Sequence, residues 1–203
     1  MTEIAPRALP EQARARATVE RILEASARLL QRDGLDAFNT NAIAAEAEVR
    51  VSTVYRYFPN KHAILAEFAR RFAAAEEAWL EDFGMLARGG DWRAALATLL
   101  KQYTRRADAF PAVVALRQAT RALPELQAIE RASTERLVTS LTRVLRARGR
   151  DLSSARARAV ATAMLETASH LIDVSRTLPA GRRRALRAEL PTLLEAHLAT
   201  VLD

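Results

Sequence analysis

The 203-residue sequence contains no cysteine and only six glycines, and aromatic side chains occupy 5% of its positions. The absence of cysteine excludes disulfides, thiolate zinc sites and cysteine nucleophiles. Charged residues interrupt every apolar stretch before it reaches the roughly 18 residues that a membrane-spanning helix needs. The N-terminal stretch MTEIAPRALPEQARAR lacks the apolar core of a signal peptide. We therefore expect a cytoplasmic protein with no membrane contact.

Residue patterns typical of catalysis are also missing. The sequence has no HExxH pair, no glycine-rich phosphate loop and no serine in a nucleophile elbow. His170 falls on one helical face with Glu166 and Asp173 and could share a metal ion with them, but we favour a hydrogen-bonded interior histidine over a metal ligand. We expect no metal, no cofactor and no enzymatic activity.

The residues that are present favour a globular protein with a basic surface. Half of them are hydrophobic and 27% are charged, which is the balance of a folded domain. The net charge is +7 at pH 7. This charge suits a polyanionic partner, although only Lys61 and Lys101 are lysines and a richness in arginine can reflect genomic composition.

Hydrophobic periodicity predicts an all-α fold of about nine helices, because apolar residues recur at spacings of three, four and seven and no period-2 run occurs. We expect helix caps at Thr40, Asn60, Asp91 and Ser153, and helix ends at Gly34, Gly149 and Pro179. Pro191 should kink or split the last helix. The predicted helices cover residues 11–33, 40–47, a third ending near 58, 61–87, 91–107, 111–121, 124–148, 153–177 and 181–202.

Residues 49–61, VRVSTVYRYFPNK, concentrate aromatic and basic side chains in a chain that has few aromatics. On a helical wheel, Val54 and Phe58 point inward, Tyr57 lies at the border, and the opposite side carries Ser52, Thr53, Tyr55 and Arg56. Hydroxyl groups and a guanidinium on one exposed face suit a helix inserted into the major groove of DNA. Ordinary amphipathic packing is the alternative explanation for the two tyrosines.

From about Arg14 to Ala69 the chain resembles the DNA-binding domain of TetR-family transcriptional regulators. The resemblance rests on T40-x-x-I43-A44-x-x-A47-x-V49, on T53-V54-Y55-x-Y57-F58 and on N60-K61. It implies a flexible arm at residues 1–13, a helix-turn-helix domain at 14–65, and an effector-binding and dimerisation domain at 66–203. It also implies a homodimer, a double-stranded DNA site with two-fold symmetry and a small-molecule effector.

The resemblance also assigns roles to single residues. Thr40 and Lys61 would hold phosphates, Asn41 is a further contact position, and Val51, Thr53, Tyr55 and Tyr57 would face the groove. With the residues that the helical wheel adds, the predicted DNA-binding set is Thr40, Asn41, Arg50, Val51, Ser52, Thr53, Tyr55, Arg56, Tyr57 and Lys61. A basic arm containing Arg7, Arg14, Arg16 and Arg21 would either touch DNA or remain solvated.

Two residues depart from the family pattern in the turn. Glu48 stands where the family often has a glycine in left-handed backbone, and Arg50 stands where Ser or Thr commonly caps the recognition helix. These departures predict a strained or shifted turn, with Ser52 as a later cap and Arg50 free to reach DNA. A domain that no longer binds DNA is the alternative.

The C-terminal helices contain apolar residues with a few polar groups, the usual composition of a small-molecule site. Core packing and solvated arginines are the alternative. The candidate ligand-binding residues are Trp92, Leu96, Tyr103, Phe110, Arg117, Arg121, Met164 and His170. The last two helices carry apolar faces that fit either a homodimer interface or packing within the monomer, and the family resemblance favours a homodimer through these two helices.

The resulting functional hypothesis is a homodimeric, ligand-responsive DNA-binding regulator. On family precedent it would be a repressor that a small molecule releases from a palindromic operator. The alternative is a helical small-molecule or protein-binding module whose helix-turn-helix does not bind DNA.

Overall fold

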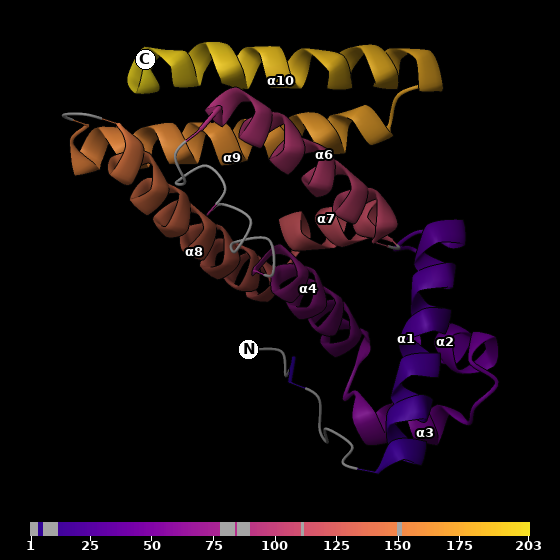
Figure 1. Ribbon diagram of the computed structural model, residues 1–203. Coiled ribbons are helices and arrows are strands. Elements are labelled where there is room, and N and C mark those ends of the chain that lie inside the picture. Colours follow the sequence, from indigo (N-terminus) through magenta and orange to yellow (C-terminus); the bar gives the residue numbers. More distant parts are fainter. Residues whose placement is uncertain (1–3, 6–11, 78–83, 85–89, 111, 150–151) are drawn as a thin grey trace. The chain divides into compact units, whose positions relative to one another are not determined.

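The computed structural model describes residues 4–5, 12–77, 84, 90–110, 112–149 and 152–203 (Figure 1). The described residues form helices and connecting turns and contain no strand, which confirms the all-α prediction. Nine helices are delimited in this part of the chain: α1 (Ala13–Asp33), α2 (Thr40–Glu46), α3 (Val51–Tyr57), α4 (Lys61–Glu77), α6 (Trp92–Ala109), α7 (Val113–Ala122), α8 (Pro124–Arg148), α9 (Ser154–Arg176) and α10 (Ala180–Leu202).

The helix ends follow local signals in the sequence. Gly34 ends α1 in left-handed backbone with φ 73°. The side chains of Asn60, Asp91 and Ser153 accept hydrogen bonds from backbone amides of the helices that follow them, so these predicted caps are confirmed. α10 runs through Pro191 as one helix, which makes the predicted split wrong. The predicted continuation of the fourth helix beyond Glu77 lies largely outside the described residues.

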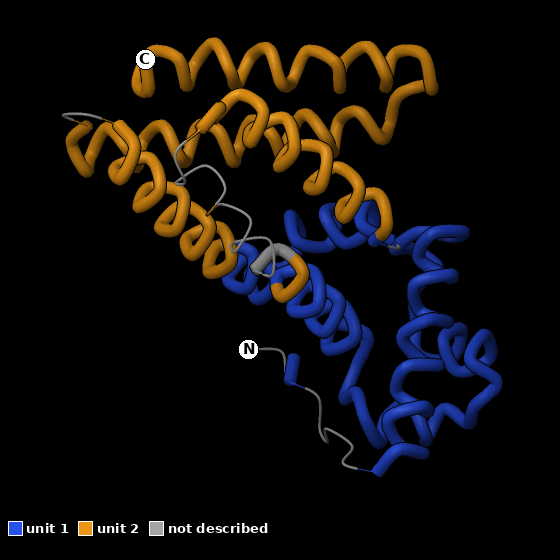
Figure 2. Tube along the Cα trace, viewed as in Figure 1, with its two compact units in different colours: residues 1–73, 110–130 blue, residues 74–109, 131–203 orange. Residues whose placement is uncertain are grey.

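The chain divides into two compact units (Figure 2). Unit 1 comprises residues 1–73 and 110–130, and unit 2 comprises residues 74–109 and 131–203. Each unit has its own hydrophobic core. These units cut the chain differently from the predicted boundary between residues 65 and 66, because α7 and the first turns of α8 belong with the N-terminal helices.

The core of unit 1 joins α1 to α4 with α7 and the start of α8. Ile22, Ile43, Val54 and Ile64 are fully buried in it, and Leu126 of α8 is 1% exposed. Phe110 packs edge-on against the rings of Phe68 and Phe72 of α4. The segment 110–130, which is separated from the N-terminal helices by residues 74–109, therefore completes their core.

An ion pair fixes α4 against α1 at the surface of unit 1. The guanidinium of Arg71 donates to both carboxylate oxygens of Glu20, at 2.7 and 2.6 Å, and its Nε donates to Glu67 at 3.1 Å. The hydrogen bond from Arg71 lowers the pKa of Glu20 below its ordinary value. Arg70 of α4 donates to the backbone oxygen of Ile4 at 2.7 Å and thereby contacts the N-terminal segment.

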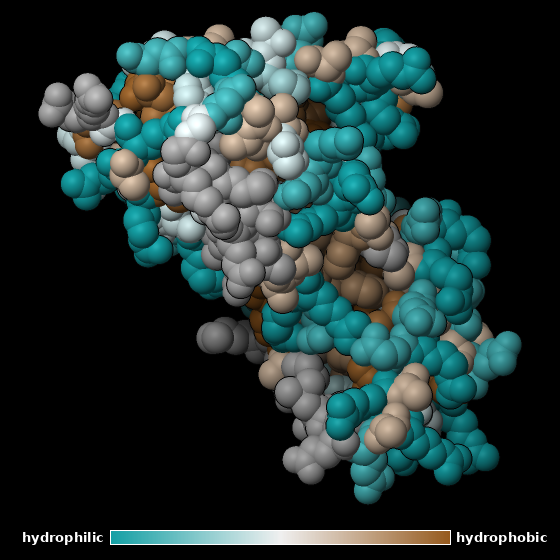
Figure 3. Space-filling view, viewed as in Figure 1, coloured by the Kyte–Doolittle hydropathy of each residue, from teal (hydrophilic) through white to brown (hydrophobic). Residues whose placement is uncertain are grey.

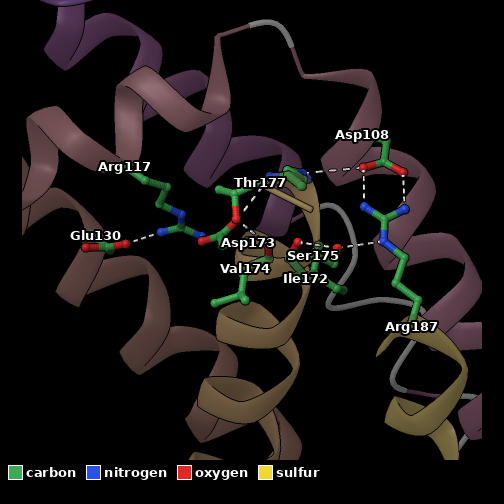
Figure 4. Close-up of polar contacts among 10 residues, drawn as sticks. Asp108, Arg117, Glu130, Ile172, Asp173, Val174, Ser175, Thr177 and Arg187 are labelled. Atoms are coloured by element: carbon green, nitrogen blue, oxygen red, sulfur yellow. Dashed lines mark hydrogen bonds and ion pairs between the residues drawn. The ribbon is translucent and has the colours of Figure 1, made fainter. Parts of the chain in front are cut away.

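Unit 2 is organised around the adjacent helices α9 and α10, with α6 packed on them. Both terminal nitrogens of Arg187 of α10 donate to the carboxylate of Asp108 of α6, at 2.7 and 2.9 Å, and the Nε of Arg187 donates to buried Ser175 of α9 (Figure 4). This contact lowers the pKa of Asp108. Arg93 of α6 similarly pairs with Glu195 of α10 and with Asp203, the residue that follows this helix. Among the described residues, no helix is both long enough and apolar enough to span a membrane.

Candidate nucleic-acid interface

The first helix of the helix-turn-helix is capped one residue earlier than the sequence predicts. Asn39 has extended backbone, and its side-chain oxygen accepts a hydrogen bond from the amide of Ala42 at 2.9 Å. Thr40 is the first helical residue of α2, so its assignment as the N-cap was wrong. Both residue types are good caps, and the structure uses the first of them. The hydroxyl of Thr40 therefore does not cap α2.

The turn between α2 and α3 holds a residue other than glycine in left-handed backbone. Glu48 has φ 53°, its amide donates to the oxygen of Ala45, and the amide of Val49 donates to the oxygen of Ala44. This pair of bonds is a Schellman helix end, which requires a left-handed residue at the position of Glu48. The turn is therefore strained and not shifted, and the strain costs about 1–2 kcal/mol.

The recognition helix begins without a side-chain cap. Arg50 occupies the N-cap position of α3 in extended backbone, and its side chain makes no capping hydrogen bond. α3 starts at Val51, so Ser52 lies inside the helix and the predicted later cap was wrong. The backbone oxygen of Arg50 still accepts the first helical bond, from Thr53 at 2.8 Å. Its exposed guanidinium is left available to another partner.

Burial fixes the orientation of α3. Val54 is fully buried and Phe58 is 1% exposed, as the helical wheel predicts. Ser52, Tyr55 and Arg56 are exposed, and Tyr55 keeps 41% of its surface accessible. Over the helix-turn-helix, the face seen in Figure 3 is mostly hydrophilic, with scattered apolar residues.

The remaining predicted groove residues are less exposed. Val51 and Thr53 are half-buried, and Val51 also packs against the core of unit 1. Tyr57 is only 7% exposed, so most of its side chain belongs to the core and not to the open face. The exposed face of α3 thus rests chiefly on Ser52, Tyr55 and Arg56.

Positive charge on this surface is not neutralised by neighbouring carboxylates. Within the described part of the chain, no ion pair involves Arg50, Arg56 or Lys61, the first residue of α4. On the other side of α2, Glu46 binds two arginines of α1, which lowers its pKa. Cations that lack a protein partner are the ones able to pair with phosphate.

A hydrogen bond connects the two helices of the motif at the surface. The hydroxyl oxygens of Thr40 in α2 and Tyr55 in α3 are 3.1 Å apart. Periodicity could not have revealed this pair, because the residues lie fifteen positions apart on different helices. Asn41, another predicted contact residue, is exposed beside Thr40.

The candidate ligand-binding residues divide between the two units. Trp92, Leu96, Tyr103 and Met164 are buried in the core of unit 2, whereas His170 of α9 is exposed. In unit 1, Phe110 packs on the core, Arg117 stacks on Phe72 and pairs with Glu130, and Arg121 is exposed. Among the described residues, no group of three His, Cys, Asp or Glu side chains could hold a metal ion.

Comparison with known proteins gives matches over both parts of the chain. Residues 22–68 match the family described as bacterial regulatory proteins, tetR family, and residues 91–198 match the Tetracyclin repressor-like, C-terminal domain. The transcriptional repressor KstR of Rhodococcus jostii is 43% identical over 54 residues, which are 26% of this chain and 26% of KstR. The chain thus spans about a quarter of that relative.

Solved structures extend the likeness to most of the chain. A TetR-family transcriptional regulator from Streptomyces coelicolor is 31% identical, with a TM-score of 0.62 over 93% of this chain and 99% of that one. The SmeT–triclosan complex shares the fold, with 17% identity and a TM-score of 0.66 over 92% of each chain.

Proposed function

This chain belongs to the TetR family of transcriptional regulators, and we propose that it acts as a homodimer on a DNA site with two-fold symmetry. The observation that carries the proposal is the outward face of α3. Ser52, Tyr55 and Arg56 are exposed above the buried Val54 and Phe58. Such a face is suited to the major groove, where hydroxyls and guanidinium groups can bond to base edges.

Cations around α3 would supply most of the affinity. Arg50 precedes the helix, Arg56 lies within it, and Lys61 begins α4, all without an ion-pair partner among the described residues. Lys61 and the positive end of the α4 dipole would hold one phosphate together. Thr53 and Arg56 are assigned to base edges, and Thr40 and Lys61 to the sugar-phosphate backbone.

Dimerisation through α9 and α10 would provide the two-fold symmetry. Leu193 of α10 is 49% exposed and Val174 of α9 is 36% exposed, so each of these adjacent helices carries a large apolar side chain at its surface. A second copy packed on these helices would cover them as part of a four-helix interface. The two recognition helices would then enter successive major grooves, roughly 34–36 Å apart.

A small molecule would control this spacing. The SmeT–triclosan complex shows that this fold can hold a small molecule, and Trp92, Tyr103 and Met164 are candidates for contacting an effector here. An effector that prefers the dimer geometry with mismatched recognition helices would release DNA by population shift. Repression, the activity of the related KstR, is the sign of control that we propose, in the cytoplasm where the chromosome lies.

The proposal is tested by titrating fluorescent duplexes, selected from a random pool, with the purified protein at 50 and 200 mM salt. We expect dimers in size-exclusion chromatography with light scattering, and an affinity that falls by at least tenfold over this range, because phosphate contacts release counterions. The competing hypothesis is that the helix-turn-helix binds a protein partner. The competing hypothesis would be favoured if the affinity for a selected duplex did not change between 50 and 200 mM salt, or if no duplex were selected.

A further inference from the structure

The chain crosses between the two compact units after residues 73, 109 and 130 (Figure 2). The first and third crossings lie inside α4 and α8, each of which continues as one helix through the crossing. The second crossing lies between Ala109, the last residue of α6, and Phe110. Because a helix bends only by disturbing its backbone hydrogen bonds, the second crossing is the one where the backbone can change direction most easily.

The unit 2 side of this crossing is fixed by Asp108. Figure 4 shows its two carboxylate oxygens facing the guanidinium of Arg187, which donates to them at 2.7 and 2.9 Å. The Nε of Arg176 donates to the same carboxylate at 3.4 Å, and the Arg176 side chain is only 9% exposed. A bidentate arginine pair fixes geometry as well as charge. The end of α6 is therefore held to both α9 and α10.

The unit 1 side is fixed by Phe110. Its ring packs edge-on against the rings of Phe68 and Phe72 of α4, with centroids 6.5 and 5.0 Å away. The guanidinium of Arg117 of α7 lies 5.1 Å from the centre of the Phe72 ring. Phe68 is 6% exposed and belongs to the core that also contains Val54 of the recognition helix. Phe110 thus contacts the helix that follows the helix-turn-helix.

Backbone strain lies immediately beyond these two contacts. Ala112 precedes α7 with φ 57° and ψ 17°, in left-handed backbone, and its oxygen accepts the first helical bond from Leu116 at 2.9 Å. Alanine has no side-chain polar group that could compensate for this conformation. Such strain persists only where the surrounding structure leaves the residue no alternative. Here the constraints are α7 on one side and the contacts of Asp108 and Phe110 on the other.

We propose that Asp108, Phe110 and Ala112 form a strained corner through which the ion pair between Asp108 and Arg187 positions the DNA-binding helices. Only Ala109 separates Asp108 from Phe110, so their Cα atoms can be at most about 7 Å apart. Release of Asp108 lets Ala112 relax and lets Phe110 withdraw from α4. Arg187 is a positioning residue in this scheme. The inference rests on the proposed DNA binding and adds a contact in unit 2 that regulates it.

Hydrogen exchange followed by mass spectrometry tests the coupling without DNA. Arg187→Gln removes the ion pair at the crossing, and Arg93→Gln is its matched control, because Arg93 also joins α6 to α10 but lies at the opposite end of α6. We expect Arg187→Gln to accelerate exchange in α3 and α4 about threefold or more. Arg93→Gln should accelerate exchange in unit 2 only.

Phe110→Leu tests whether the effect passes through the corner. This substitution keeps an apolar side chain but removes the ring contacts with Phe68 and Phe72. In the Phe110→Leu background, Arg187→Gln should change exchange in α4 by less than about twofold, because the contact that carries the effect is already lost. A general loss of stability would instead add to the effect of Phe110→Leu.

Titration of a fluorescent duplex that the wild type selects from a random pool links the corner to function. Arg187→Gln should weaken binding about 3- to 10-fold, whereas Arg93→Gln should leave the affinity unchanged. The dependence on salt should keep its slope in Arg187→Gln, because no phosphate contact is removed. A slope reduced by about 1 would instead mean that Arg187 touches DNA itself.

The inference is overturned if Arg187→Gln accelerates exchange in unit 2 alone, if Arg93→Gln accelerates α4 equally, or if the Arg187→Gln effect persists in Phe110→Leu. It is also overturned if Arg187→Gln binds a selected duplex as tightly as the wild type does. A wild type that selects no duplex refutes the proposed function, and the exchange results then decide the coupling by themselves.

Discussion

Replacing Glu48 with glycine should stabilise the protein. Glu48 holds φ 53° in a turn whose two closing hydrogen bonds leave it no other conformation. A side chain in left-handed backbone destabilises the folded state by about 1–2 kcal/mol, and glycine removes this strain. Glycine also gives the unfolded chain more conformational freedom, which lowers the gain in stability by roughly 0.5–1 kcal/mol. The expected net gain is about 0.5–1 kcal/mol in the free energy of unfolding.

Urea unfolding followed by circular dichroism measures this gain. With a denaturant slope of about 2–3 kcal/mol/M, the midpoint of Glu48→Gly should rise by roughly 0.2–0.5 M. Glu48→Ala is the matched control, because it removes the carboxylate but keeps the Cβ and therefore the strain. Equal stabilisation by Ala and Gly would mean that charge repulsion, not backbone strain, is relieved. A destabilised Gly variant would refute the left-handed assignment.

Three further substitutions test other parts of the molecule. Asn39→Ala should lower the free energy of unfolding by about 1 kcal/mol in the same urea experiment, because α2 loses its cap, whereas Asn39→Asp should retain most of it. Lys61→Ala should weaken all duplexes alike in fluorescence anisotropy and reduce the salt slope by about 1, and a change in base preference would contradict its phosphate role. Glu20→Gln should destabilise the protein at pH 7, where the carboxylate binds Arg71. Since the pKa of Glu20 is lowered in the folded state, its contribution is present above the ordinary value of 4.5 and is lost as the pH falls through the folded pKa. The midpoints of wild type and Glu20→Gln should therefore converge in acid, and a constant difference would exclude the ion pair as the cause.

Local signals in the sequence predict the helices and the orientation of α3. The helix ends at Gly34 and the caps at Asn60 and Ser153 depend on neighbouring residues only, and Val54 and Phe58 share a face because they are four residues apart. Tyr57 lies three residues after Val54, so in a helix of seven residues a small rotation moves it from the border into the core. Periodicity cannot resolve that rotation.

Contacts between distant residues were beyond the reach of sequence patterns. The hydrogen bond between Thr40 and Tyr55 and the ion pair between Arg187 and Asp108 each join two helices. They can be predicted only after the helices have been positioned relative to one another. The choice of Asn39 over Thr40 as the cap depends on which of two adjacent residues adopts extended backbone. The candidate effector residues were chosen by composition, and composition does not show which compact unit a residue belongs to. The chain leaves unit 1 after residue 73 and returns to it at residue 110, so these residues are divided between the two units.

That return has a consequence for how such regulators can be recombined. Residues 110–130 supply Ala115, Leu116, Ala119 and Leu126 to the core that surrounds the helix-turn-helix. A chimera that grafts residues 1–73 onto a foreign sensor would leave those hydrophobic contacts unfilled unless it also carries α7 and the first turns of α8. Exchange of DNA specificity between paralogues is therefore expected to succeed by replacing the outward residues of α3, and to fail when the entire N-terminal segment is exchanged as a block.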